Sequence, residues 1–401
     1  MKINFPLMLF IVTVAWGIFP LNQVKAQGSV EILEQTVDFL FNDWLHFSAR
    51  FDSSESLQEG FVFFQFAGSE QVWVFEGELE NDQTLDVQVQ LSEDNSPPPF
   101  TELEYWYRFA SDHGEIFESQ HYTLYYDDNR YTWQVLEYPP FVLYWHHGDL
   151  AFGQSILAAA QQGEARARQL LPLAELEDVV LRVYDNAQDV QLIARQAGFT
   201  WQAGHTDPQA GLILLSLPAE PQGSLEIQRQ VPHEIAHLML YQSLGAAYYR
   251  LPNWLNEGIA SNAEIYSDPE QAEMMDLANA GGNLIPFSSL CRAFPQDGAS
   301  ARLAYAQSAS FIRYLFDQYN QVGFSLMVDA YAKSDDCVAA PVQDFGKDLV
   351  ALDADWRAAT FTQDEGILAW FSAAPWRAIL VSAGIAFVIF LSFRFVRIGR
   401  K

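Results

Sequence analysis

The stretch VPHEIAHLML, residues 231–240, places two histidines four residues apart, with a glutamate directly after the first. On a helix, His233 and His237 lie one turn apart on the same face, where two imidazoles can share one metal ion such as zinc. Glu234 lies one position further round, so it cannot easily become a third ligand. It is placed instead to accept a proton from a water molecule bound beside the two rings.

The neighbouring sequence favours a helix at this stretch. Ser224 can cap its beginning, and an apolar stripe follows at helical spacing through Ile227, Val231, Ile235, Leu238 and Met239. Pro232 either starts a fresh helix at the motif or kinks a longer one, and the sequence leaves both open.

A catalytic zinc needs a third protein ligand and an open position for water. The segment NWLNEGIAS, residues 253–261, begins directly after a Leu-Pro pair and contains Glu257. The spacing leaves room for the first helix to end near Gly245 and for a second helix to return beside it. Glu257 is therefore a candidate for the third ligand.

Together, HEIAH and NWLNEG resemble the gluzincin metallopeptidases of the peptidase MA-like clan, whose third ligand is a glutamate on a downstream helix. The likeness covers about residues 150–360, and only these two motifs in it are specific. It implies a zinc cofactor held by His233, His237 and Glu257, with Glu234 as the general base of peptide hydrolysis. The GxMEN motif of the clan's exopeptidases is absent from the sequence, so we expect an endopeptidase acting on peptides or proteins.

The resemblance also implies a donor for the oxyanion formed during hydrolysis. Tyr305, in RLAYAQSASFIRYLF, is the first candidate, with simple packing on an amphipathic helix as its alternative role; His205 is a weaker candidate. Some thermolysin-like members carry an aspartate four residues after the glutamate ligand, where it orients a histidine. Ser261 occupies that place here, so we expect a weaker hydrogen bond to the imidazole.

Residues 139–365 are predicted to form an α+β, zincin-like metallopeptidase domain, with strands before the motif helix and helices after it. The segment GLILLSL resembles the edge strand along which the clan binds an extended substrate. Because it is apolar on both faces, a buried central strand is the alternative.

Residues 27–138 show a different pattern. LHFSARF, LDVQVQL and LEYWYRF alternate apolar and polar residues, and turn-rich pieces separate such runs. About seven short strands in about 110 residues resemble an immunoglobulin- or fibronectin-like β-sandwich. We expect the aromatic residues of this domain to pack in its core rather than to bind sugars.

Both ends of the chain are typical of membrane targeting. Residues 1–26 resemble a secretory signal peptide, with an uncleaved anchor as the alternative. Residues 366–395 contain the uncharged run AILVSAGIAFVIFLSF, and a basic tail follows over 396–401. We therefore predict a C-terminal transmembrane helix in a single-pass protein of the cell membrane, with the catalytic domain outside and the C-terminus in the cytoplasm. A buried soluble helix is the alternative.

Composition narrows the possible functions. The chain has 22 basic and 51 acidic residues, for a formal net charge of −29. This argues against nucleic-acid binding, whose affinity rests on Lys and Arg neutralising phosphates. In an oxidising compartment, a disulfide between Cys291 and Cys337 is slightly favoured over two buried thiols.

Two other functions stay open. One is a non-catalytic surface binding or adhesion protein that keeps zinc for structure, and the other is a zinc hydrolase that acts on non-peptide bonds. Glu234 counts against the first, because a structural zinc site needs no base and tends to be closed by a fourth ligand. The sequence does not indicate an oligomeric state.

Overall fold

The structure is a computed structural model. It describes residues 30–361, apart from residue 67 and the stretches 81–82, 93–94, 197–203 and 220–222, and it also describes Trp376. The predicted signal peptide (1–26), the predicted membrane span (366–395, Trp376 excepted) and the basic tail (396–401) lie outside the described residues. In the part of the chain that is described, no helix is both long enough and apolar enough to cross a membrane.

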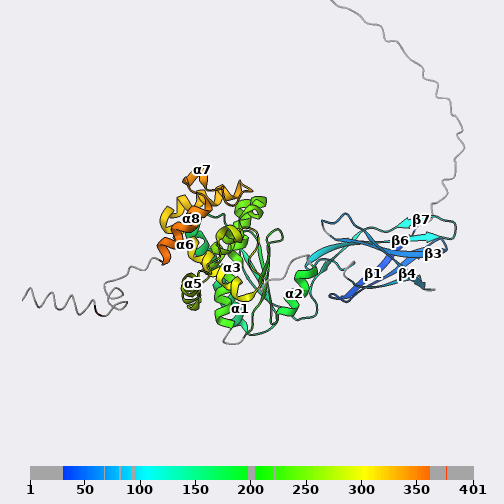
Figure 1. Cartoon of the computed structure of the whole chain (residues 1–401). Coiled ribbons are helices and arrows are strands. Elements are labelled where there is room, and N and C mark those ends of the chain that lie inside the picture. The colour runs from blue at the N-terminus through cyan, green and yellow to red at the C-terminus, as the bar shows by residue number, and fades with distance from the viewer. Residues whose placement is uncertain are drawn as a thin grey trace, which may run out of the picture. The chain divides into compact units, whose positions relative to one another are not determined.

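The chain divides into two compact units, residues 1–131 and 132–401 (Figure 1). The domain boundary predicted from the sequence lies later, after residue 138. The difference is strand β9 (Gln134–Tyr138), which pairs with β10 (Phe141–Trp145) and so belongs to the sheet of the second unit.

The first unit is all β, as predicted. Its strand order is β1-β2-β5-β4-β3-β6-β7, with β8 also pairing with β6, and all of these pairs are antiparallel. The strands are β1 Val30–Leu40, β2 Trp44–Ser53, β3 Leu57–Phe66, β4 Trp73–Glu80, β5 Thr84–Gln90, β6 Thr101–Ser111, β7 Ile116–Glu118 and β8 Tyr122–Tyr126. The three alternating runs lie in β2, β5 and β6. The immunoglobulin- or fibronectin-like topology stays a prediction.

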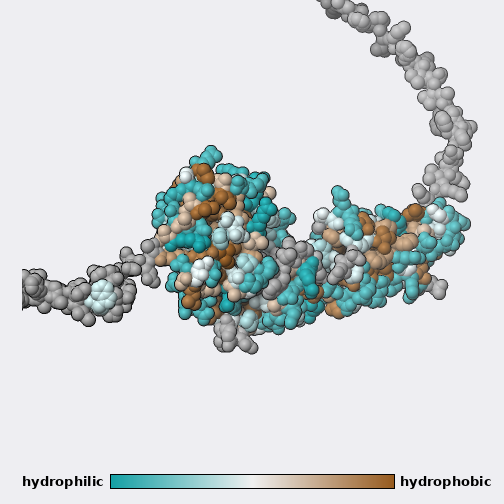
Figure 2. All heavy atoms as spheres, viewed as in Figure 1, coloured by the Kyte–Doolittle hydropathy of each residue, from teal (hydrophilic) through white to brown (hydrophobic). Residues whose placement is uncertain are grey.

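Side chains that alternate along these strands form the core of the first unit. Phe47, Phe64, Tyr107 and Phe109 are fully buried, because residues two apart on a strand face the same side of the sheet. Hydrophilic residues cover much of the visible surface of each unit, with apolar patches between them (Figure 2).

The second unit combines a five-stranded sheet with helices. Its strand order is β12-β13-β11-β10-β9, in which β10, β11 and β13 are parallel and the two outer strands are antiparallel. The remaining strands are β11 Val179–Tyr184, β12 Gly204–Asp207 and β13 Leu212–Ser216. The helices are α1 Leu150–Leu170, α2 Ala187–Gln196, α3 Gly223–Leu244, α4 Asn253–Ala263, α5 Glu270–Ala280, α6 Gly298–Ala332, α7 Val342–Phe345 and α8 Leu349–Phe361, with 3₁₀ helices η1 Gly245–Arg250 and η2 Phe287–Leu290.

The interpretation of GLILLSL as an edge strand is wrong. This segment forms β13, which lies between β11 and β12. Ile213, Leu214 and Leu215 are almost fully buried, which explains why the run is apolar on both faces. Among the described strands, β12 is the outermost one on this side of the sheet.

Helix α4 lies between two hydrophobic clusters. One contains the sheet, α1 and α3, and it takes Ala260 and Ala263 from α4. The other is built mainly from helices, and it takes Trp254, Leu255 and Ile259. Because apolar groups are buried on both sides of α4, the orientation of this helix is well determined.

A disulfide joins Cys291 to Cys337, as the sequence slightly favoured. The backbone carbonyl of Cys291 also accepts a hydrogen bond from the backbone N–H of Asn253, at the first residue of α4, with an N···O distance of 3.0 Å. The disulfide therefore ties the beginning of α4 to the segment that follows α6.

We expect the Cys337→Ser variant to lose about 2–4 kcal/mol of free energy of unfolding, because the disulfide closes a long loop in the unfolded chain. The separation of the two cysteines is 46 residues. Urea unfolding of the variant and of the oxidised protein gives the difference. Adding a reductant should destabilise the wild-type protein and leave the variant unchanged; equal stability of the two oxidised proteins would contradict the prediction.

Candidate metal centre

Helix α3 carries both histidines of the motif. It runs unbroken through Pro232, so no fresh helix starts at the motif and the proline lies inside one longer helix. The helix begins at Gly223, and Ser224 therefore lies in its first turn, where its hydroxyl accepts a hydrogen bond from the side chain of Gln228. The predicted apolar stripe is buried against the sheet and α1.

Helix α1 approaches α3 closely at the motif. A Cβ atom placed on Gly163 of α1 would lie only 2.6 Å from the Cα atom of Pro232. A glycine is therefore needed opposite this proline, and the tight contact holds the turn of α3 that leads into His233.

A short connection returns the chain to the site. Helix α3 ends at Leu244, and Gly245 follows with a left-handed φ of 57°, the conformation that glycine adopts readily at helix ends. After η1, α4 begins at Asn253 and packs beside α3, as the spacing of the two motifs predicted. This return brings Glu257 to the two histidines.

The three predicted ligands converge. The distance from His233 Nε2 to Glu257 Oε2 is 3.2 Å, and from His237 Nε2 to the same oxygen it is 3.6 Å. One candidate ligand atom from each residue lies within 4.8 Å of the other two. Ligands around a tetrahedral zinc are about 3.4 Å apart when each bond is about 2.0–2.1 Å. Two imidazoles and one carboxylate at these separations therefore fit a zinc ion.

The other nitrogen of each ring is also held. His233 Nδ1 lies 2.9 Å from Glu264 Oε1, and His237 Nδ1 lies 3.1 Å from Asn256 Oδ1. Because both oxygens are acceptors, each Nδ1 carries the proton and donates it. Once a metal ion has displaced any proton on Nε2, the lone pair of each Nε2 can point toward the centre, which is the tautomer a metal ligand needs.

Glu264 takes the place expected for Ser261. It is the residue that caps the C-terminal end of α4, two helical turns after Glu257 and on the same face. The sequence shows this glutamate seven residues after Glu257, and that spacing could have identified it as a partner of a histidine. Asn256 lies inside the motif itself, and its amide also donates to the hydroxyl of Tyr248 at 2.9 Å. Neither partner was identified from sequence.

Charges around His233 change its proton affinity. In the absence of a metal ion, burial lowers the pKa of this imidazole. The hydrogen bonds and negative charges of Glu257 and Glu264 outweigh that effect and raise the pKa from 6.5 to about 10. For Glu257, burial raises the pKa, but the charge of His237 and the hydrogen bonds with both histidines hold it well below its usual range.

Zinc binding should therefore release one proton and strengthen with pH. His233, with its pKa of about 10, is protonated below that pH and must lose a proton to become a ligand. We expect the zinc affinity to rise about tenfold per pH unit between about pH 7 and 9. Competition with a chromophoric chelator measures the zinc affinity. Calorimetry in two buffers of different ionisation enthalpy gives the number of protons released on binding. An affinity independent of pH would contradict the prediction.

Glu234 follows His233 on α3 and does not belong to the group of three candidate ligands. Its side chain is buried, with only 7% of the residue exposed. The hydroxyl of Thr206, in β12, donates a hydrogen bond to Glu234 Oε2 at 2.6 Å. The carboxylate is thus held as a hydrogen-bond acceptor one residue after His233, and its role as a general base stays a prediction.

Tyr305 lies on α6, close to the same group. Its ring centroid is 6.2 Å from that of His233, and it also packs against Phe294 at 4.9 Å. Burial raises the pKa of its hydroxyl, and the nearby negative charges of Glu257 and Glu234 raise it further. Tyr305 is therefore protonated throughout the working pH range and can donate a hydrogen bond.

The glycine of the NEG triplet allows α6 to approach α4. A Cβ atom on Gly258 would lie 2.6 Å from Ile312 Cγ1 and 2.8 Å from the backbone oxygen of Ser308. Tyr305 lies one turn before Ser308, so the close crossing brings it toward Glu257. The other oxyanion candidate, His205, lies in β12 opposite Leu214, and its side chain is outside the described part.

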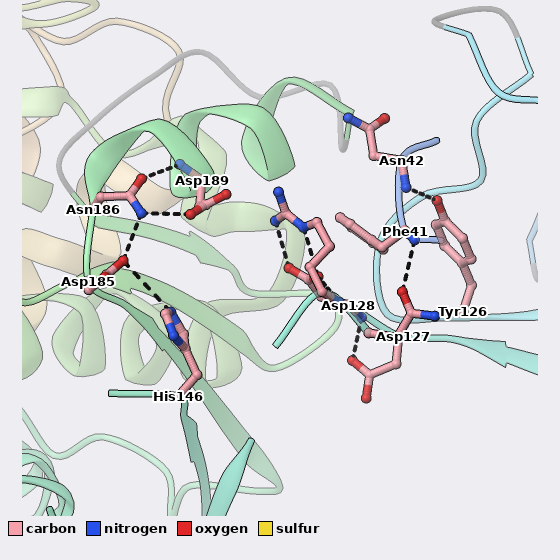
Figure 3. A network of polar contacts seen from close by, with 11 residues as sticks. Phe41, Asn42, Tyr126, Asp127, Asp128, His146, Asp185, Asn186 and Asp189 are labelled. Carbon is pink, nitrogen blue, oxygen red and sulfur yellow. Dashed lines mark hydrogen bonds and ion pairs between the residues drawn. The ribbon is translucent and has the colours of Figure 1, made fainter. Parts of the chain in front are cut away.

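A second polar cluster lies at the carboxyl ends of β10 and β11 (Figure 3). The amide nitrogen of Asn186 donates to Asp185 and to Asp189, at 2.7 Å each, and His146 Nε2 lies 3.9 Å from Asp185. The backbone N–H of Asp189 donates to Asn186, at the beginning of α2. Among the described residues, the group that could hold a metal ion is that of His233, His237 and Glu257.

Comparison with known proteins agrees with this site. The family model of the Peptidase MA superfamily matches residues 159–362, which include both motifs and Tyr305. A search of curated proteins finds no match.

Solved structures resemble the chain only remotely. An aminopeptidase N family protein from Idiomarina loihiensis is 10% identical, with 86% of this chain and 74% of that chain covered and a TM-score of 0.31. A polysaccharide deacetylase from Bacillus cereus is 12% identical, over 51% of this chain and 78% of that chain, with a TM-score of 0.20. A β-1,3-glucan-binding domain of carbohydrate-binding module family 56 is 13% identical, over 25% of this chain and 99% of that chain, with a TM-score of 0.16.

Proposed function

This chain belongs to the peptidase MA superfamily, and on that basis we propose that it is a zinc-dependent endopeptidase with Glu234 as its general base. One observation carries the proposal. The Nε2 atoms of His233 and His237 face a single oxygen of Glu257, while a hydrogen bond on the far side of each ring holds it in that orientation.

His233, His237 and Glu257 would hold the zinc ion. Two imidazole nitrogens and one carboxylate are a known ligand set for catalytic zinc and leave a position for water. When bound, zinc supplies Lewis-acid chemistry, which acidifies a water molecule and polarises a carbonyl group.

Glu234 would move the proton. Its carboxylate would accept a proton as the water oxygen bonds to the carbonyl carbon of the substrate. The same carboxyl group then returns the proton to the nitrogen of the breaking C–N bond, so that the products are a carboxylic acid and a free amine. The buried position of Glu234 keeps competing solvent away from this transfer.

Tyr305 would donate a hydrogen bond to the oxyanion. We expect the Tyr305→Phe variant to lower kcat by about 10²-fold, in the range found when one oxyanion donor is removed. The zinc content should stay unchanged, because Tyr305 is not a ligand. Phe294→Leu is the matched control, since it alters the ring that packs against Tyr305 and leaves the hydroxyl in place. A Tyr305→Phe variant with wild-type kcat would leave only the packing role.

The edge strand β12 would bind the substrate. An extended peptide that adds to its outer edge forms main-chain hydrogen bonds and so tolerates many side chains. The strand also carries Thr206, which contacts the general base, so a peptide bound along it would pass close to Glu234. Endopeptidase action follows from such a mode, since main-chain pairing needs no free terminus.

Export and membrane anchoring belong to the same proposal. The apolar, charge-free run within 366–395 and the basic residues of 396–401 support an anchor, and residues 1–26 support secretion. The disulfide between Cys291 and Cys337 agrees with an oxidising compartment. Protease accessibility of the second unit on intact cells tests this orientation.

Metal content and peptide cleavage, measured on one purified sample, test the function. We expect about one zinc per chain and internal cuts in a mixed peptide library, analysed by mass spectrometry, that disappear with a chelator and return with zinc. Bound zinc without cleavage would favour the non-catalytic surface protein. Cleavage of ester or amide probes with intact peptides would favour a non-peptide hydrolase.

A further inference from the structure

Thr206 connects the edge of the sheet to the catalytic helix. It lies in β12, opposite Ile213 of β13, and β12 is the last strand on that side of the sheet. Its hydroxyl reaches Glu234 Oε2 at 2.6 Å. Within the described ranges, no other side chain is hydrogen-bonded to this carboxylate.

A glutamate side chain needs such a partner to stay in one position. The final torsion of the side chain is broad, so the plane of the carboxylate is not determined by rotamer preference. Glu234 cannot be held by the metal either, because it lies one position round the helix from the ligands. A donor fixed to a neighbouring strand therefore sets where its two oxygens lie.

We propose that Thr206 is a positioning residue for the general base: its hydroxyl holds Oε2 of Glu234 so that Oε1 is free to accept the proton from water. This inference rests on the proposed function and adds to it a residue that neither motif contains. A threonine hydroxyl has a single proton to donate, so it fixes one oxygen of the carboxylate and leaves the other available.

Loss of the Thr206 hydroxyl should lower kcat and leave KM unchanged. Removal of its hydroxyl leaves the main chain of β12, where substrate would pair, and leaves the three metal ligands in place. Ground-state binding is then unchanged, whereas a misplaced base slows the proton transfer. A displacement of about 1 Å can cost about a hundredfold in rate.

The test compares Thr206→Val, which keeps the shape and removes the hydroxyl, with Thr206→Ser, which keeps the hydroxyl. The full-length, zinc-loaded protein is assayed with fluorescently labelled casein. We expect Thr206→Val to lower kcat about 10- to 100-fold, with KM and zinc content within about twofold of wild type. Thr206→Ser should restore kcat to within about threefold. Thr123→Val, at an exposed strand position of the first unit, is the matched control and should be unchanged.

A second measurement does not depend on activity. In a crystal structure of Thr206→Val, we expect the carboxylate of Glu234 to be rotated or spread over more than one position, and in Thr206→Ser to be single. Wild-type kcat in Thr206→Val, an equal loss in Thr206→Ser, or an unmoved carboxylate in Thr206→Val would each overturn the inference. Absence of zinc-dependent cleavage by the wild-type protein would instead overturn the proposed function, and the crystal structures would then decide the inference alone.

Discussion

Replacing Glu234 with glutamine should abolish hydrolysis and leave zinc bound. We expect kcat to fall by about 10³-fold, the middle of the range for loss of a general base. Glutamine has the same shape as glutamate and its amide oxygen can still accept the hydrogen bond from Thr206, but it cannot take a proton from water. Cleavage of labelled casein measures kcat, and elemental analysis of the same sample measures zinc.

Glu226→Gln is the matched control for this experiment. Glu226 lies two turns earlier on α3, where its side chain bonds to Arg229, and it contacts none of the three ligands. Its kcat should be within about twofold of wild type, as for most surface substitutions. Normal cleavage by Glu234→Gln would refute the role of base, and loss of zinc from that variant would make Glu234 a ligand.

Replacing Glu257 with alanine should have the largest effect on metal affinity. We expect the zinc dissociation constant to rise by more than about a hundredfold, because partners that act only through a ligand are already worth about 10- to 100-fold. Loss of the carboxylate removes one of three ligands and also the negative charge that faces both Nε2 atoms. Competition with a fluorescent zinc chelator measures the change.

The Glu264→Gln variant should have a zinc affinity between those of wild type and Glu257→Ala. It keeps a hydrogen-bond acceptor for His233 Nδ1 and removes the negative charge behind the ring. We expect its zinc affinity to fall about tenfold, the lower end of the range for such partners. Equal affinities of Glu257→Ala and wild type would show that the three residues do not hold the ion, and a larger loss in Glu264→Gln than in Glu257→Ala would reverse their assigned roles.

Sequence patterns predicted correctly the features that depend only on residues close together along the chain. The four-residue spacing of His233 and His237 places both rings on one face of any helix, so their convergence could be predicted. The alternation in β2, β5 and β6 predicted half-buried strands for the same kind of reason, since side chains on a strand change face at every residue. Spacing made Glu257 a candidate, and its assignment as the third ligand came from the resemblance to a family, because no local rule joins α4 to α3.

Strand order and the partners of the ligands required the tertiary structure. The apolar run of β13 is compatible with an edge or a centre, and only the pairing of β12 decides between them. From the sequence, we expected Ser261, four residues after Glu257, to hydrogen-bond to a histidine. In the structure, Glu264, seven residues after Glu257, hydrogen-bonds to His233.

Helix periodicity and the two motifs were therefore enough to identify the residue types of the site. The neighbours that orient them came from the tertiary structure: Asn256 and Glu264 hydrogen-bond to the histidines, Thr206 hydrogen-bonds to Glu234, and β12 is the outermost described strand on its side of the sheet. These are contacts between elements that are distant along the chain, and they depend on how the helices and the sheet pack, which no local spacing specifies.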